Sequence, residues 1–272
     1  MPSDDEEIST QWTKSLTPEE HQRLEQQNTR LVSNHKANTL ENEAKKHWDL
    51  FYKRNETRFF KDRHWSTREF TELLSDDENE KRRVLFEIGC GVGNFIFPLI
   101  EEKLDFKVFA CDLSPRAIEI LKTNPLYNLS ETTAFQCDIT TEDVHKHVEK
   151  DCIDIVTLIF VLSAIHPDKF TITLKNIFTV LKPGGLVLFR DYGLYDMAQI
   201  RFKPGNKIAE NFYMRQDGTR SFYFSTDFVK SIFEIVGFEI MENTYIHRRT
   251  VNKKENVDVP RIFVQTKARK PA

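Results

Sequence analysis

A glycine-rich turn between an apolar run and a helix-like segment is the feature that most constrains this chain. Its residues, Gly89-Cys90-Gly91-Val92-Gly93-Asn94, directly follow Val84-Leu85-Phe86-Glu87-Ile88. Glycines in such a turn let the backbone approach a ligand where any Cβ would clash. Asp112 ends the next apolar run, and a carboxylate accepts hydrogen bonds without donating any. The pattern predicts a nucleotide-cofactor site in which Gly89 and Gly91 line the ligand and Asp112 holds the ribose hydroxyls, although glycine-rich turns are also common structural loops.

From Val84 onward, apolar runs alternate with segments of helical periodicity. Strands are expected at 83–88, 106–111, 133–137, 153–160, 185–190, 238–248 and 260–267. Helices are expected at 94–102, 114–124, 167–181 and 226–236. The alternation predicts an α/β fold with a Rossmann-like, mainly parallel sheet of seven strands and helices on both faces. No helix separates the last two strands, so a hairpin there would make the last strand antiparallel.

The first 75 residues do not follow this alternation. The acidic stretch 1–16 is expected to be disordered, and 17–50 to form one or two helices beginning near Thr17, which has capping character. Residues 75–81 resemble a surface linker. We therefore expect a partly disordered tail at 1–40, a helical segment at 41–75, and an α/β domain at 76–272 with an insertion at about 192–224.

Composition limits the location and the partners. With 272 residues, 39% of them hydrophobic, the chain can bury one good-sized core, and it carries no apolar run of membrane-spanning length and no signal peptide. Its four cysteines lack CxxC spacing, which favours reduced core residues over a metal site. The net charge of −3 predicts that any RNA site is a local patch or is supplied partly by another protein. We expect a cytoplasmic protein that also enters the nucleus.

The GxGxG spacing resembles the first motif of S-adenosylmethionine-dependent methyltransferases rather than the GxGxxG of dinucleotide folds. Longer motifs are more specific, and from about residue 40 to the C-terminus the chain is similar to the eukaryotic tRNA 3-methylcytidine methyltransferases. The motifs that carry this resemblance are Trp48–Asn55, Phe59–Trp65, Leu158–Lys169, Phe189–Asp196 and Gln216–Arg220. The resemblance implies the class I methyltransferase sheet and S-adenosylmethionine as cofactor. It also implies a tRNA substrate methylated on an anticodon-loop cytidine, usually position 32.

Two further segments, His166–Lys169 and Val251–Lys254, look most like the branch of this family that acts on serine tRNAs. That branch needs seryl-tRNA synthetase. The resemblance therefore implies serine tRNAs as substrates and the synthetase as a partner.

The chemistry requires alignment more than acid–base catalysis, because cytosine N3 carries a lone pair at neutral pH. The methylated base is a cation, so a carboxylate near its exocyclic amine would stabilise the developing charge. Asp191, at the end of the fifth expected strand, is the predicted catalytic group, with Arg190 and Tyr192 shaping the site. The alternative is that Asp191 caps a turn or pairs with an arginine.

Other cofactor contacts follow from the fold that the resemblance implies. Asp138 is expected at the adenine amine with Ile139 on the adenine ring, and Ile159 under the methionine portion. Asp138 could instead cap the next helix, and Ile159 could be ordinary core. Trp48 and Tyr52 share a helix face, which normally means core packing. In the family, the N-terminal segment folds over the cofactor. The resemblance therefore implies that Trp48 and Tyr52 belong to a lid over the cofactor, and that residues 41–75 form this lid and contact RNA.

RNA contacts are expected from basic segments that carry aromatic residues, since unpaired bases are read by stacking and phosphates by cations. The predicted RNA-binding residues are Lys53, Arg54, Lys61, Arg63, Arg215 and Arg220. The insertion adds Tyr195, Phe202, Phe212, Tyr213 and Phe222, and a third basic patch comprises Arg248, Arg249, Lys253 and Lys254. Each charged run could alternatively be a solvated surface.

Three other functions are alternatives to an RNA methyltransferase. The glycine turn and Asp112 would serve a protein or small-molecule methyltransferase equally well, but the basic insertion favours an anionic substrate. A silent RNA-binding or synthetase-associated scaffold would not need an intact cofactor motif. An NAD oxidoreductase is disfavoured by the GxGxG spacing and by the lack of a recognisable substrate domain.

Overall fold

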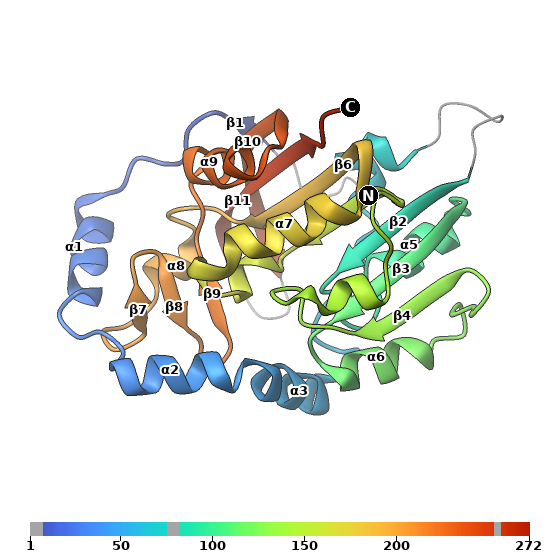
Figure 1. Ribbon diagram of the computed structural model, residues 1–272. Helices are drawn as coiled ribbons and strands as arrows, with labels where there is room; N and C mark the ends of the chain where they lie inside the picture. Colours follow the sequence, from blue (N-terminus) through green and yellow to red (C-terminus); the bar gives the residue numbers. More distant parts are fainter. Residues whose placement is uncertain (1–7, 75–81, 253–256) are drawn as a thin grey trace. The chain divides into compact units, whose positions relative to one another are not determined.

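The computed structural model describes residues 8–74, 82–252 and 257–272 (Figure 1). The chain forms two compact units. Unit 1 contains residues 1–44, 160–170 and 189–268, and unit 2 contains residues 45–159, 171–188 and 269–272. The expected linker at 75–81 lies outside the described residues, and the expected domain boundaries remain predictions.

Unit 2 holds the parallel part of the sheet. Its strands are β2 (Arg83–Ile88), β3 (Phe106–Asp112), β4 (Thr132–Gln136), β5 (Ile153–Ile159) and the first part of β6 (Leu181–Tyr192), in the order β6-β5-β2-β3-β4. β2 pairs in parallel with both β3 and β5, and β3 pairs in parallel with β4. The four complete strands match the expected ones to within one residue. A parallel strand whose two faces are both covered needs apolar side chains on both, which is why β2 and β5 are buried almost throughout, whereas the edge strand β4 has exposed positions.

The helices of unit 2 follow these strands. They are α5 (Ile96–Glu101), α6 (Pro115–Lys122) and most of α7 (Phe170–Val180), with a 3-10 turn at Glu142–Lys146. Ser114 caps α6 as expected, since its Oγ accepts a hydrogen bond from the Ala117 N–H at 3.2 Å. β6 begins at Leu181 rather than 185, because Gly184 N–H donates to the Lys270 carbonyl and the Lys270 N–H donates to the Gly185 carbonyl. Residues 181–185, which include both glycines, are therefore already part of the strand.

Unit 1 holds the antiparallel end of the sheet. Its strands are β1 (Ile8–Thr10), β10 (Glu239–Asn252), β11 (Val257–Arg269) and the end of β6, in the order β1-β10-β11-β6. Only four residues separate β10 from β11, too few for a parallel crossover, so the two run antiparallel as expected. β1 adds an unexpected strand, with Ile8 opposite His247. The expectation of disorder is therefore wrong for Ile8–Thr10, because the backbone of these residues pairs with β10 as an antiparallel strand. Residues 1–7 lie outside the described chain.

The N-terminal region contains three helices instead of one or two: α1 (Pro18–Gln27), α2 (Asn34–Asn42) and α3 (Ala44–Asn55). The capping box at Thr17 is confirmed, because Thr17 Oγ1 accepts from Glu20 N–H and Glu20 Oε2 accepts from Thr17 N–H. A second cap, Ser33, accepts from Lys36 N–H at 3.3 Å and starts α2 anew. Two short helices, α4 (Ser66–Glu69) and a 3-10 turn at Thr71–Leu73, follow α3.

The insertion folds in unit 1 as a small sheet of its own. Strands β7 (Lys207–Ala209), β8 (Phe212–Met214) and β9 (Arg220–Phe222) are antiparallel, preceded by α8 (Met197–Ile200) (Figure 1). Gln27 of α1 is fully buried against this insertion. Its Nε2 donates to the carbonyls of Gln199 and Phe202, and its Oε1 accepts from the Tyr213 hydroxyl at 2.9 Å. One polar side chain thus joins α1 to a segment more than 170 residues away.

Three elements complete unit 1. Helix α9 (Thr226–Val236) matches its expected range, begins at the Ser225 cap and ends at Gly237, whose φ is 107°. Two 3-10 turns, Leu162–Ala164 and Pro167–Lys169, lie between β5 and α7, so the helix expected from 167 begins as an α-helix only at Phe170.

Candidate cofactor and substrate sites

The glycine turn adopts the conformation that its sequence requires. Gly89, Gly91 and Gly93 have φ values of 64°, 55° and 95°, in the left-handed region that side chains disfavour. Cys90 N–H donates to the Cys111 carbonyl at 3.0 Å, which ties the turn to the end of β3. Predicted cofactor residues Gly89 and Gly91 therefore lie on a tight turn directly beside the strand that carries Asp112.

Asp112 is positioned by two backbone donors. Gly91 N–H donates to its Oδ2 at 2.9 Å and Ser114 N–H donates to its Oδ1 at 2.8 Å, and the residue is 7% exposed. Leu113 N–H also interacts with this carboxylate, whose about four lone-pair sites leave acceptor capacity for a ligand hydroxyl. Burial raises the pKa of Asp112 to about 6, and the backbone hydrogen bonds partly oppose that rise. The carboxylate is thus held in one orientation beside the glycine turn, with acceptor capacity to spare.

The aromatic face of α3 covers the same turn. A Cβ on Gly91 would lie 2.7 Å from the Tyr52 hydroxyl oxygen, so only glycine fits beneath that ring. Tyr52 is buried in a cluster with Phe51, Val92 and Ala117, and half-buried Trp48 packs against it with its ring centroid 6.3 Å from that of Tyr52. This packing is the core role weighed from the sequence, and it also puts both predicted lid residues at the glycine turn.

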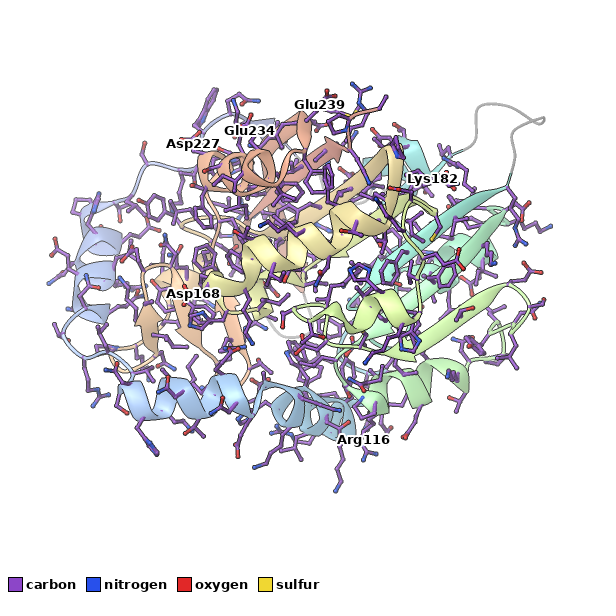
Figure 2. The ribbon with its side chains drawn as sticks, viewed as in Figure 1. Arg116, Asp168, Lys182, Asp227, Glu234 and Glu239 are labelled. Atoms are coloured by element: carbon purple, nitrogen blue, oxygen red, sulfur yellow. The ribbon has the colours of Figure 1, made fainter. Side chains whose placement is uncertain are left out.

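A polar contact fixes α3 against α6. Asp49 Oδ1 accepts from the Ser114 hydroxyl at 3.0 Å and from Arg116 N–H at 3.2 Å. The Arg116 guanidinium, labelled in Figure 2, lies 3.6 Å from Asp49 Oδ2. Asp49 therefore supplements the cap of α6, directly after the strand end that holds Asp112.

The remaining predicted cofactor residues also belong to unit 2. Asp138 Oδ1 accepts from both the N–H and the hydroxyl of Thr140, so it caps the local turn and not, as the alternative held, the next helix. Its Oδ2 receives no hydrogen bond from the described residues. Ile139 and Ile159 are buried, and the Ile159 carbonyl accepts from Arg63 Nη1 at 3.1 Å. Their cofactor contacts remain predictions.

Glu87 is a site feature that we did not single out from the sequence. It precedes the glycine turn on β2, is buried, and has an Oε2 that accepts no hydrogen bond from the described residues. Burial raises its pKa to about 8, with the charge of Asp112 adding to the rise and that of Arg63 opposing it. An acidic residue inside an otherwise apolar run was the signal that could have identified it.

These groups fit an adenosyl-type cofactor. The turn under Tyr52 is a cradle that any Cβ at Gly91 would fill, and Asp112 offers oriented acceptors for a pair of hydroxyls. S-adenosylmethionine would be held here by Gly89, Gly91 and Asp112, and would supply an activated methyl group when bound.

Cofactor affinity should fall as the pH drops through about 6. The carboxylate form of Asp112 is the one predicted to accept from the ribose hydroxyls, and below its raised pKa the group becomes protonated and loses acceptor capacity. Calorimetric titration with S-adenosylhomocysteine between about pH 5 and 8 measures this dependence. In Asp112→Asn the step near pH 6 should vanish; its persistence would assign it to another group.

The predicted catalytic residues lie in unit 1 at the end of β6. Asp191 is fully buried, and its Oδ2 and Oδ1 accept from the N–H groups of Ser163 and Tyr192, both at 2.9 Å. Burial raises its pKa to about 6, opposed by these hydrogen bonds and by the charge of Arg215. The Ser163 hydroxyl also hydrogen-bonds to this carboxylate, so Asp191 makes the capping contacts of the structural alternative. Its catalytic role remains a prediction.

Arg190 and Tyr192 differ in exposure. Arg190 is buried, donates to Gln265 Oε1 at 3.3 Å and lies over the Phe263 ring at 5.2 Å. Tyr192 is half-buried, with the Arg215 guanidinium 5.1 Å from its ring centroid. Arg261, which the sequence did not indicate, lies 5.9 Å from the same ring. Of the two flanking residues, Tyr192 is therefore the one that reaches solvent.

The predicted RNA-binding residues fall into two groups. Lys53, Arg54 and Lys61 are exposed, as a phosphate contact requires. Arg63 is half-buried and bonded to the Ile159 carbonyl, and Arg215 lies over Tyr192. These five remain predictions.

Arg220 does not fit the role predicted for it. Its guanidinium is 5% exposed, pairs with Glu41 and donates to the Ala164 carbonyl at 3.2 Å. Lys169 pairs with the same Glu41 at 2.5 Å. Arg220 is thus an internal link from β9 to α2, a role that its position in a basic run could not reveal.

Four of the five aromatic residues of the insertion, all but half-buried Tyr195, pack together as a core, which corrects their expected role on the RNA-facing surface. Phe212, Tyr213 and Phe222 are buried, and Phe202 stacks on Tyr213 at 4.7 Å with the rings 6° from parallel. A three-stranded sheet this small needs large side chains to exclude water, so the aromatic content reflects packing.

Of the third basic patch, Lys253 and Lys254 lie outside the described residues.

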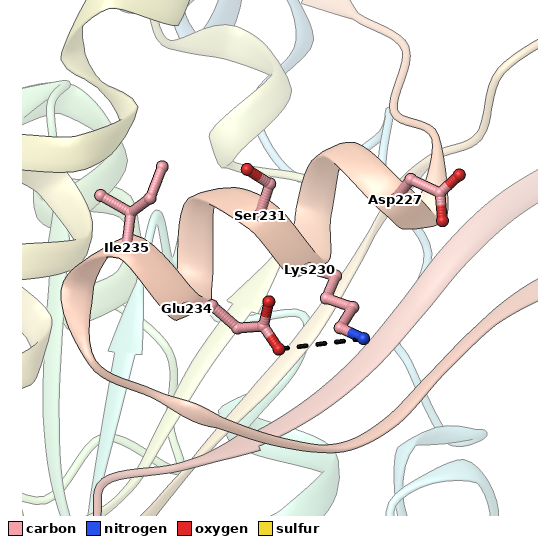
Figure 3. A pocket seen from close by; sticks show the side chains of 5 residues that line it. All are labelled: Asp227, Lys230, Ser231, Glu234 and Ile235. Carbon is pink, nitrogen blue, oxygen red and sulfur yellow. Dashed lines mark ion pairs between the residues drawn. The ribbon is translucent and has the colours of Figure 1, made fainter.

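Other features bear less on function. A shallow hollow over α9, lined by Asp227, Lys230, Ser231, Glu234 and Ile235, includes none of the predicted site residues (Figure 3). Within the described parts of the chain, no three His, Cys, Asp or Glu side chains are grouped so as to hold a metal ion. The helices described there are also too short or too polar to span a membrane.

The fold and the glycine-turn site define a class I methyltransferase, and solved structures share that fold. A methyltransferase from Anabaena variabilis aligns with a TM-score of 0.59 at 12% identity, covering 83% of this chain and 94% of its own. One from Methanosarcina mazei aligns at 0.53 and 17%, covering 71% and 94%. At these identities the likeness shows the fold alone.

Sequence comparisons identify the family. The model of the methyltransferase domain family matches residues 31–243. Human tRNA N(3)-cytidine methyltransferase METTL6 is 56% identical over 257 residues, which cover 94% of this chain and 90% of the relative. The METTL2 enzyme of Xenopus tropicalis is 36% identical, covering 97% and 88%, and trm140 of Schizosaccharomyces pombe is 41% identical, covering 83% and 74%. The chain belongs to the tRNA N(3)-cytidine methyltransferase family, and S-adenosylmethionine is its cofactor.

Proposed function

We propose that this protein methylates N3 of cytidine 32 in the anticodon loop of serine tRNAs, with seryl-tRNA synthetase as its partner. The main support for this reaction is the 56% identity to human tRNA N(3)-cytidine methyltransferase METTL6 over nearly the whole chain. The cofactor site supports it, because the glycine turn and the oriented Asp112 are those of a working methyltransferase and not of a silent scaffold. The tRNA position rests on the resemblance to the family, and the serine branch rests on the sequence motifs His166–Lys169 and Val251–Lys254.

In this reaction the protein aligns the base and stabilises charge. Cytosine N3 already carries its lone pair, so no proton has to be removed before it accepts the methyl group that bound S-adenosylmethionine would supply. The product base is cationic, so a carboxylate directed at its exocyclic amine lowers the barrier. Asp191 is the proposed carboxylate, and the exposed Lys53, Arg54 and Lys61 are proposed to hold the RNA backbone.

Nucleoside analysis of tRNA from cells that lack the protein tests the function directly. Loss of 3-methylcytidine confined to position 32 of serine tRNAs is the expected result. Loss from other tRNAs would reject the serine branch and keep the reaction, whereas unchanged 3-methylcytidine would reject the reaction itself.

Methylation of serine tRNA by the purified protein should rise at least about tenfold when seryl-tRNA synthetase is added at limiting tRNA. The net charge of −3 and the short basic segments predict weak, salt-dependent tRNA binding by the chain alone. A tRNA-bound partner raises the local substrate concentration, so the gain should appear mainly as a lower KM.

Two comparisons sharpen this experiment. A non-cognate synthetase is the control and should give no increase. Lys53→Ala and Lys61→Ala should weaken methylation with and without the partner, since both side chains are exposed and are proposed to contact RNA. Equal activity on non-serine tRNAs would contradict the branch assignment.

A further inference from the structure

Phe160, directly after β5, has a backbone conformation that is costly for a bulky residue. Its φ is 60°, in the left-handed region that glycine and asparagine usually occupy. Such strain persists only where the surrounding structure imposes it, and it clusters at functional sites. Contacts around Phe160 must therefore hold its backbone in this conformation.

Tertiary contacts fix the segment that Phe160 begins. The Phe160 N–H donates to the Arg190 carbonyl at 2.8 Å. Three residues later, Ser163 N–H donates to Asp191 Oδ2, and the Ala164 carbonyl then accepts from buried Arg220. The segment is bound at both ends, and two of these hydrogen bonds are made to the adjacent residues Arg190 and Asp191.

The ring of Phe160 is half-buried and packs against Tyr192, one of the predicted site residues. Its centroid lies 5.1 Å from that of half-buried Tyr192 and 5.3 Å from that of buried Phe263. The strained backbone thus keeps a partly exposed aromatic ring next to Tyr192, whose neighbour in the chain is Asp191.

We propose that Phe160 is the platform on which the target cytosine stacks, and that it is therefore a specificity-determining residue. The inference rests on the proposed function. Bases taken out of a loop are commonly stacked on aromatic side chains. The ring face also attracts cations, so this contact strengthens as the base acquires the positive charge of 3-methylcytidine. Phe160 would then contribute both to RNA affinity and to turnover.

A comparison of two RNAs with two proteins tests this contact. The RNAs are a serine tRNA anticodon stem–loop with cytidine at the target position and the same RNA with an abasic site there. The full chain should bind the abasic RNA about tenfold or more weakly, because one base stack is lost. In Phe160→Leu that loss should shrink by about fivefold or more, with anisotropy as the readout.

Two variants separate stacking from structural damage. Phe160→Tyr keeps the ring and should keep the wild-type difference between the two RNAs. Phe228→Leu, which removes a partly exposed ring from α9, is the matched control and should also keep it. Thermal unfolding shows whether each variant is folded. If Phe160→Leu does not fold, the tyrosine variant and the turnover of Phe160→Trp carry the test, since any aromatic ring should serve.

The outcomes distinguish this inference from the proposed function. An unchanged cytidine-to-abasic ratio in Phe160→Leu, or no base dependence in the wild-type protein, would overturn the stacking role while tRNA methylation stands. Absence of methylation by the wild-type protein would instead refute the proposed function.

Discussion

Replacing Asp191 by alanine should lower the single-turnover rate of methyl transfer by a factor of about 10²–10³, the usual effect of removing one preorganised charge-stabilising group. The carboxylate is held by the N–H groups of Ser163 and Tyr192 and need not reorient as charge develops on the base. Because its stabilisation grows in the transition state, the affinities for cofactor and tRNA should change little.

Asp191→Asn is the matched variant, since it keeps the size and removes the charge. Burial raises the pKa of Asp191 to about 6, so the folded protein gains no stability from ionising this group, and neither variant should unfold it through loss of charge. Rapid-quench kinetics at saturating tRNA give the rate, and calorimetry gives the affinities. Normal single-turnover rates with a collapsed tRNA affinity would show that Asp191 serves binding or structure, as its capping contacts allow.

Replacing Asp112 by alanine should weaken S-adenosylmethionine binding by about 2–4 kcal/mol, or roughly 30- to 1,000-fold in Kd. The variant loses the acceptors for both ribose hydroxyls and leaves the N–H groups of Gly91 and Ser114 without their partner. Calorimetry on a variant shown to be folded by circular dichroism measures the effect. RNA affinity should stay within about twofold, because the change is confined to the cofactor site.

Asp138→Ala provides the comparison. Asp138 makes the same kind of turn-capping contact at the end of the neighbouring strand, but only its Oδ1 is engaged by the described residues. A smaller loss of cofactor affinity than in Asp112→Ala is expected. Equal cofactor affinity in Asp112→Ala and the wild-type protein would remove Asp112 from the cofactor site.

Several residues predicted to contact RNA make internal contacts in the structure, which the sequence did not indicate. Arg220 and Arg215 stand in the same basic run, yet Arg220 is buried against Glu41, a residue 179 positions away, and Arg215 covers a tyrosine ring. The aromatic residues of the insertion likewise turned inward to form the core of β7, β8 and β9. Composition gives the same signal for a base-stacking surface and for a small core, because both need large flat side chains.

The sequence by itself determined the order and type of strands β2 to β6, β10 and β11, and the form of the glycine turn. These depend on local physics: apolar runs bury both faces of a parallel strand, Ser114 and Thr17 cap helices through their own side chains, and Gly91 takes a positive φ that other residues resist. Only the tertiary structure decided that Ile8–Thr10 joins the sheet, that Gln27 anchors α1 to the insertion, and that Phe160 is held in a left-handed conformation. Each of those depends on a partner far away in the chain, and nothing in the local sequence indicates which distant group will provide the hydrogen bond.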